Sequence, residues 1–209
     1  YRKTFMRFSL SFASVGFCYF AIGLAKKTPI ADPLAENNAI FFARTAELLP
    51  VEAWLNMFMY SFRIYFDFSA YADMAVGLGY LFGVQLPRNF ISPYKATNIS
   101  EFWRVWHASL YHFFREYLFK RLLRVSFYQA HIALAVMSVM LVSAVWHGVG
   151  WGYLAWGAGH GLLMVAYRWG RRYVDFSKPG RSGPVAHFVW LWICRAVLFV
   201  AVSFLWLPF

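Results

Sequence analysis

Apolar residues are gathered in about six long segments, and polar connections separate most of them. The segments are residues 8–25, 51–66, 69–86, 126–146, 149–167 and 187–208. Most of them approach the roughly 20 apolar residues that an α-helix needs to cross a bilayer core of about 30 Å. Asp67 separates the second segment from the third, and Arg195 interrupts the last one. The pattern predicts an all-α, polytopic membrane protein.

Residues 87–124 have a different pattern, because Lys and Arg side chains are mixed with aromatic ones there. This stretch is too charged to span a bilayer and too aromatic for a free loop, so we expect an interfacial or re-entrant amphipathic helix. Asn98 or Ser100 can cap its N-terminus, with Glu101 in the first turn. Steps of three or four residues place one set of side chains on a single helical face. That set is Trp103, His107, Leu110, Phe114 and Tyr117.

Composition and charge agree with a membrane protein. The chain is 61% hydrophobic and 14% charged, whereas soluble domains average about 45–50% and about 25%. The net charge is +11, and the basic residues flank the apolar segments instead of forming the exposed patch that nucleic-acid binding requires. Cytoplasmic loops carry an excess of Lys and Arg, so we place the connections 26–50, 87–124 and 168–186 on the cytoplasmic side.

Two histidines are the candidates for chemistry. His147 closes an apolar run, from Ile132 to Trp146, that contains no charged side chain, and His107 lies on the aromatic face of the amphipathic stretch. Ionisable groups in such settings are functional candidates by default. A lone histidine among aromatic residues is, however, more often a packing residue than a catalyst. No Cys/His cluster has zinc spacing, so we expect no metal site.

Several ordered motifs occur along the chain: residues 64–79, 87–90 and 101–118, then Trp146-His147-Gly148 and His160-Gly161. Together they resemble one family, the bacterial membrane-bound O-acyltransferases. Its alginate O-acetyltransferase branch is the most similar. Residues 118–122 depart from that branch and are closer to the D-alanyl transferases that modify teichoic acid.

The resemblance implies a partial form of the family fold, with residues 1–209 as a single membrane-embedded catalytic region that lacks N-terminal helices. It implies a multi-pass protein of the bacterial cytoplasmic (inner) membrane. The expected reaction moves an acetyl group from acetyl-CoA, or another cytoplasmic thioester, to hydroxyls of an exported polysaccharide such as alginate. The alternative is transfer to a periplasmic acetyltransferase partner that completes the reaction. No cofactor is expected to stay bound.

The resemblance also assigns roles. His147 is the expected general base, since neutral imidazole suits deprotonation of an alcohol at pH 7, and His107 is expected to orient the donor or the acceptor. Asp67 and Asp73 either orient a histidine or a basic side chain, or form structural ion pairs with Arg63 or Arg104. The other candidates for binding substrate or donor are Trp103, Arg104, Trp106, Ser109, Arg115 and Trp146.

Basic side chains of the amphipathic stretch have two readings. Arg104, Arg115 and Lys120 either attract the phosphates of coenzyme A or form a basic face against the inner leaflet. For the chain as a whole, three other functions remain open. They are D-alanyl or other acyl transfer to an envelope polymer, a transporter or channel with a histidine relay, and a scaffold that recruits an enzyme. A transporter is disfavoured because the sequence lacks paired broken helices in two halves.

Overall fold

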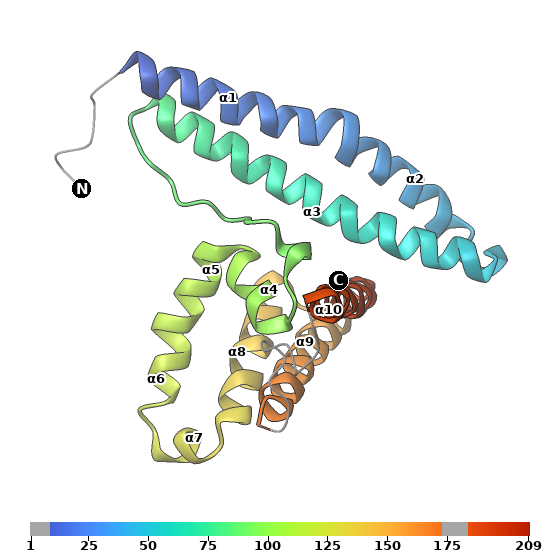
Figure 1. Ribbon diagram of the computed structural model, residues 1–209, viewed down its shortest axis with the longest axis vertical. Coiled ribbons are helices and arrows are strands. Elements are labelled where there is room, and N and C mark those ends of the chain that lie inside the picture. The colour runs from blue at the N-terminus through green and yellow to red at the C-terminus, as the bar shows by residue number, and fades with distance from the viewer. Residues whose placement is uncertain (1–8, 173–183) are drawn as a thin grey trace. The chain divides into compact units, whose positions relative to one another are not determined.

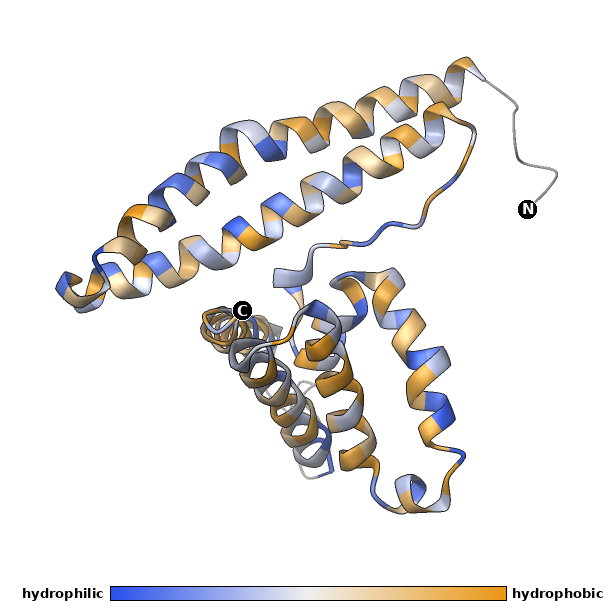
Figure 2. Cartoon of the chain, turned by 180° about the vertical axis from the view of Figure 1, so that it is seen from behind, coloured by the Kyte–Doolittle hydropathy of each residue, from blue (hydrophilic) through white to orange (hydrophobic). Residues whose placement is uncertain are grey.

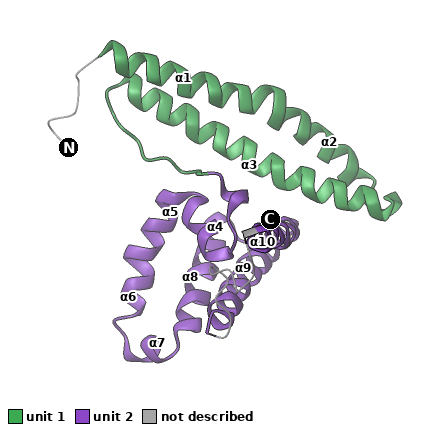
Figure 3. Ribbon diagram, viewed as in Figure 1, with its two compact units in different colours: residues 1–91 green, residues 92–209 purple. Residues whose placement is uncertain are grey.

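The computed structural model describes residues 9–172 and 184–209, and within these residues it contains helices and no strands. The chain divides into two compact units, residues 1–91 and 92–209, as Figure 3 shows. The all-α prediction is therefore confirmed for the described part of the chain, and each unit is described separately below.

The first unit is a long helical hairpin (Figure 1). One arm is α1 (Leu10–Lys26), the π-helical turn η1 (Lys27–Ala31) and α2 (Asp32–Ala43), which follow one another without a loop. A short turn, η2 (Thr45–Glu47), leads into the second arm, α3 (Pro50–Leu81). The expected polar connection 26–50 is thus mostly helical. Its Pro29 lies in η1, and a wider turn of this kind accommodates the missing proline N–H.

The predicted break at Asp67 is wrong, because α3 runs unbroken through it. Lys27 Nζ lies 2.7 Å from Asp67 Oδ1, so the carboxylate has a partner on the other arm of the hairpin. Because its charge is paired, Asp67 does not destabilise the helix at this position, and the helix continues.

Small residues bring α1 and α3 together. A β-carbon added to Gly77 would lie 2.6 Å from the carbonyl oxygen of Gly16, and one added to Gly16 would lie 2.8 Å from that of Gly77. Such contacts let two helix backbones approach closely, as is common in membrane proteins.

The second unit begins with a series of short helices, where the sequence predicted one amphipathic helix. These are η3 (Pro93–Lys95), α4 (Ile99–Val105), α5 (Ala108–Phe113), the π-helical η4 (Phe114–Phe119), α6 (Lys120–Leu122) and α7 (Ser126–Ala130). Three longer helices follow, α8 (Ile132–His147), α9 (Trp151–Gly170) and α10 (Pro184–Trp206). The helical nature of residues 97–124 is confirmed, whereas their position relative to a bilayer stays a prediction.

One helix of the described chain, over Val185–Trp206, is long and apolar enough to cross a membrane, and the apolar α8 is shorter. Figure 2 shows that α8 is predominantly hydrophobic. Arg195, the charged residue that interrupts α10, has a partner from a distant part of the sequence. Its Nε donates a hydrogen bond to the carbonyl oxygen of Lys95 at 3.0 Å. The six-span topology stays a prediction, and residues 173–183 of the basic connection 168–186 lie outside the described residues.

Candidate functional site

The predicted helix start is confirmed at α4. Asn98 Oδ1 accepts a hydrogen bond from the backbone N–H of Glu101 at 2.8 Å, and Glu101 Oε2 accepts one from the backbone N–H of Thr97 at 3.0 Å. These reciprocal bonds satisfy N–H groups that a helix start leaves without partners. They fix the helix that carries Trp103.

The helix then breaks at His107, so the prediction of one continuous aromatic face is wrong. Trp106 is extended, with ψ of 121°, and His107 is left-handed, with φ of 46° and ψ of 54°. Trp106 is buried against Trp206, with ring centroids 4.9 Å apart, and this packing competes with continuation of the helix. A left-handed residue other than glycine costs about 1–2 kcal/mol, and residues held this way cluster at functional sites.

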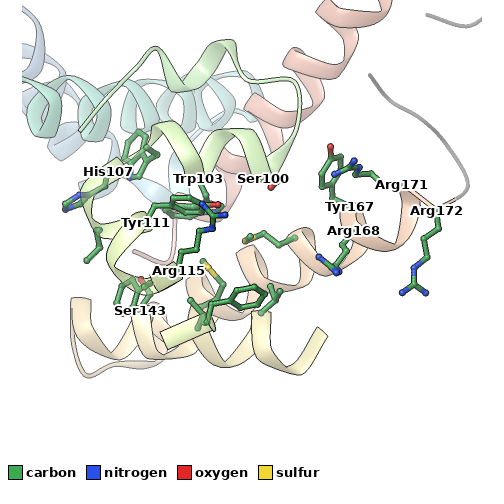
Figure 4. Close-up of a pocket in the computed structure, with 18 residues that line it drawn as sticks. Ser100, Trp103, His107, Tyr111, Arg115, Ser143, Tyr167, Arg168, Arg171 and Arg172 are labelled. Carbon is green, nitrogen blue, oxygen red and sulfur yellow. The ribbon is translucent and has the colours of Figure 1, made fainter. Parts of the chain in front are cut away.

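A pocket of about 510 Å³ opens beside His107 (Figure 4). Its walls come from α4, α5, η4, α8 and α9. His107 lies at one side of the view, and three arginines from the end of α9 lie at the other. The residues that line it are Ser100, Trp103, Trp106, His107, Leu110, Tyr111, Phe114, Arg115, Phe119, Val136, Val139, Met140, Ser143, Met164, Tyr167, Arg168, Arg171 and Arg172.

The charge of the pocket is strongly positive. Arg115, Arg168, Arg171 and Arg172 line it, and its described lining includes no Asp or Glu. Arg171 lies over the ring of Tyr167, 5.9 Å from the ring centroid, which orients its guanidinium. Guanidinium groups pair with phosphate oxygens in a planar, two-pronged geometry. The arginine side of the pocket is therefore suited to an anionic, phosphate-bearing group.

The three basic residues expected to attract phosphates differ in their positions. Arg115 lines the pocket, Arg104 is exposed and is not part of the lining, and Lys120 pairs with Glu116. Sequence reasoning missed Arg168, Arg171 and Arg172. Their only signal was three arginines close together at the end of an apolar segment, which also fits a simple basic loop.

His107 and His147 lie close enough for a charge on His107 to act on His147, although His147 is not part of the pocket lining. Burial lowers the pKa of the His107 side chain below its ordinary value, so its neutral form predominates at pH 7. A neutral imidazole in the lining of a pocket can accept and return a proton.

Aromatic rings surround His147 at the C-terminal end of α8. Its ring centroid lies 4.8 Å from Trp146, 5.1 Å from Trp156 and 4.9 Å from Phe209. The side chain is only half-buried, so a substrate can reach it. The turn between α8 and α9 lies at Gly148, between the two apolar segments 126–146 and 149–167 that the sequence predicted. The space beside Gly148 is filled, because a β-carbon there would lie 2.4 Å from the ring of Tyr153.

His160 was matched to a motif but given no role, and the structure places it behind the pocket. It lies on α9 with none of its surface exposed, and its Nδ1 is 3.0 Å from the carbonyl oxygen of Trp156. Its ring centroid is 5.1 Å from both Trp103 and Trp156, and 5.6 Å from Trp206. The sequence contained one indication of this position. His160 follows Trp156 by four residues, so the two side chains share one face of a helix.

The remaining predicted residues are divided between the two units. Trp103 and Trp106 line the pocket, whereas Ser109 does not, and Trp146 is exposed beside His147. In the first unit, Asp67 pairs with Lys27 and Asp73 pairs with Lys26. The ion-pair reading of both carboxylates fits, but the partners are lysines of the hairpin, so pairing with Arg63 or Arg104 was wrong.

The chain matches the membrane-bound O-acyltransferase family over residues 5–207. It belongs to this family. This membrane-bound O-acyltransferase is 41% identical over 155 residues to a peptidoglycan O-acetyltransferase of Helicobacter pylori, an alignment that covers 74% of the chain and 29% of the relative.

Two further branches of the family match as well. A probable alginate O-acetylase of Azotobacter vinelandii is 40% identical over 151 residues, covering 71% of the chain and 30% of the relative. A teichoic acid D-alanyltransferase of Bacillus subtilis is 34% identical over 130 residues, covering 57% and 33%. The matched part of the chain thus spans about a third or less of the length of these curated relatives. The family resemblance read from the motifs is confirmed.

Proposed function

We propose that this chain is the acyl-transfer region of a bacterial membrane enzyme that acetylates an exported cell-envelope polysaccharide such as alginate. The observation that carries the proposal is that one pocket is lined by His107, by apolar side chains and by several arginines. The names of the relatives, which cite peptidoglycan, alginate and teichoic acid, support an envelope polymer as the acceptor.

The donor in this proposal is acetyl-CoA or another acetyl thioester that carries phosphate. Its phosphates bind near Arg168, Arg171 and Arg172, and its thioester reaches the His107 side of the pocket. The apolar lining between these places, including Val136 and Met140, suits an extended thiol arm. No cofactor stays bound, because the donor is consumed in each turnover.

The proposed reaction is a direct acyl transfer. His147 takes the proton of an acceptor hydroxyl, and the oxygen attacks the thioester carbonyl. The carbon–sulfur bond breaks, the acetyl group stays on the oxygen, and the thiolate leaves and takes the proton back from His147. His107 orients the thioester, since it lines the pocket that holds the donor.

Acetyl transfer is favoured over D-alanyl transfer by the charge of the pocket. A D-alanyl thioester carries an ammonium group, and the described lining offers it no carboxylate. A cation that binds there gives up part of its hydration without gaining a counter-ion, which has a cost in binding free energy. A neutral acetyl group has no such cost.

We place the enzyme in the bacterial cytoplasmic membrane, with the arginine side of the pocket toward the cytoplasm, where the thioester is made. The acceptor is the polysaccharide itself, or a periplasmic acetyltransferase partner that completes the transfer. The basic residues of the predicted cytoplasmic connections support this orientation.

The test uses the full-length protein in a strain whose own gene is deleted. Mass spectrometry of the isolated envelope polymers should show O-acetyl groups only when the gene is present. Ester-linked D-alanine without acetylation would instead identify the D-alanyl reaction. If the polymers are unchanged in both respects, the chain is a scaffold or a transporter and the proposal is wrong.

A further inference from the structure

His160 and three tryptophan rings that contact it each have a buried nitrogen without a hydrogen-bond partner among the described residues. A carbonyl oxygen only accepts, so His160 Nδ1, 3.0 Å from the carbonyl oxygen of Trp156, must carry the ring hydrogen. His160 Nε2 is then a bare acceptor, and it has no hydrogen-bond partner among the described residues. The indole N–H groups of Trp103, Trp156 and Trp206 are equally buried and lack partners within the described chain.

This arrangement is costly for stability alone. Each buried polar group without a partner costs about 1–3 kcal/mol, and apolar side chains of similar size would fill the space without that cost. Unsatisfied groups in a native protein call for an explanation, and a catalytic role is one of the few available. One bare acceptor, next to three indole rings whose N–H groups are unpaired among the described residues, indicates a hydrogen bond that is made in another state of the enzyme.

Trp103 is the indole that connects His160 to the chemistry. It lines the pocket together with His107, and its ring is perpendicular to that of His160 at a centroid distance of 5.1 Å. Trp206 also touches His160 but is not part of the pocket lining. A donor that fills the pocket therefore acts directly on Trp103 and leaves Trp206 without direct contact.

We propose that His160 is a positioning residue: its Nε2 accepts a hydrogen bond from the indole N–H of Trp103 in the donor-bound state. This bond locks the pocket wall next to His107 and sets the thioester in line with the acceptor. Trp156 extends the same support to His147, since its ring lies 5.1 Å from the His147 ring. The inference rests on the proposed acyl transfer.

Two substitutions of His160 separate positioning from simple packing. The side-chain amide of His160→Asn lies near the place of Nδ1, so it retains the bond to the Trp156 carbonyl and loses the Nε2 acceptor. The amide of His160→Gln reaches the place of Nε2 and offers an acceptor there. We expect His160→Asn to lower kcat about tenfold with donor KM changed less than about twofold, because a donor that is bound but poorly aligned reacts more slowly. His160→Gln should retain most of kcat.

The partner is tested with matched indole variants of the full-length enzyme. Trp103→Phe keeps an aromatic ring and removes the N–H, and it should lower kcat about as much as His160→Asn. The double variant should lose no more than either single one, since residues that share one bond are not additive. Trp151→Phe removes the N–H of an exposed indole outside the pocket lining and should keep normal kcat.

The outcomes are distinct. Greater activity in His160→Asn than in His160→Gln, additive losses in the double variant, or an equal loss in Trp151→Phe would each overturn the inference. So would activity losses that only follow the amount of folded protein in the membrane, measured by detergent extraction and gel filtration. Wild-type protein without any acyl transfer would instead contradict the proposed function itself.

Discussion

The two units of the chain differ in how they hold their polar side chains. In the first unit, Lys27 and Asp67 form an ion pair at 2.7 Å, and the buried Asn38 Nδ2 donates to Asn56 Oδ1 at 2.6 Å, while Asn38 Oδ1 has no partner among the described residues. In the second unit, the buried His160 Nε2 has no partner among the described residues, and His107 has a left-handed backbone.

The difference indicates that the first unit contributes mainly stability and that the second unit contains the reactive site. A hairpin whose charges are paired and whose helices meet at small residues is organised to stay folded. A region that departs from local rules in several places, and that surrounds a pocket, is organised for reaction. The pocket side of the second unit also has a π-helical turn, η4, a feature often found at functional sites.

The largest expected effect on acyl transfer comes from replacing His147, the proposed general base in the second unit. His147→Ala should lower acyl transfer by at least about 10²–10⁴-fold, the usual contribution of a general base. His147→Gln should be nearly as inactive, because an amide does not take up a proton. The measurement is polymer acetylation by mass spectrometry, with membrane abundance followed by immunoblot.

Matched controls for His147 come from the same chain. His112 and His131 are exposed, and neither lines the pocket, so His112→Ala and His131→Ala should be close to normal. If the His147→Ala protein is abundant in the membrane and still acetylates the polymer, His147 is not the general base. A fall in abundance alone would make His147 a packing residue.

The arginines of the pocket come next in expected effect. The triple change of Arg168, Arg171 and Arg172 to Ala should raise donor KM about tenfold or more, since tenfold corresponds to only about 1.4 kcal/mol of binding. Arg104→Ala removes a charge that is exposed and outside the pocket lining, so it should leave donor KM unchanged. Equal effects of both changes would show that the membrane surface, not the pocket, attracts the donor. Donor kinetics at two salt concentrations measure this, because exposed charges are screened by salt.

The backbone of His107 gives a smaller, separable effect. His107→Ala and His107→Gly both remove the imidazole and should both reduce transfer. Glycine takes up a left-handed conformation without strain, so His107→Gly should be more stable than His107→Ala by about 1 kcal/mol. Thermal unfolding of the two purified variants compares them. A less stable glycine variant would mean that His107 is held by its side chain and not strained by its backbone.

The smallest effect is expected in the first unit. Asp67 is about half-exposed, at 49% of its side chain, so its ion pair contributes at most about 1 kcal/mol. Asp67→Asn should therefore leave acyl transfer almost normal and lower thermal stability only slightly. A large loss of transfer at normal abundance would bring the hairpin into the chemistry and break the comparison.

Sequence patterns predicted the elements that depend on local signals. The apolar runs 149–167 and 187–208 locate both ends of α9 and α10 to within three residues, and Asn98 caps α4 as expected. The run 126–146 locates the end of α8, but α8 begins six residues later than the run, because the separate helix α7 occupies 126–130. These features follow from hydrophobic runs and from one side chain bonding a nearby N–H.

Features set by distant contacts could not be predicted. The unbroken α3 depends on Lys27, which lies 40 residues before Asp67. The break at His107 depends on the packing of Trp106 against Trp206, and the pocket joins Arg115 to arginines of α9. Periodicity describes one helix at a time, so it contains no information on these pairings.

The central claim is that the acyl donor binds in the pocket of the second unit. An acyl-CoA analogue with a photoreactive diazirine in its acyl group tests this directly in the full-length enzyme, with the labelled peptides identified by mass spectrometry. We predict labelling within residues 99–119, 136–143 and 164–172, which unlabelled acetyl-CoA suppresses. Labelling concentrated within residues 10–81, or labelling that acetyl-CoA does not suppress, would contradict the claim.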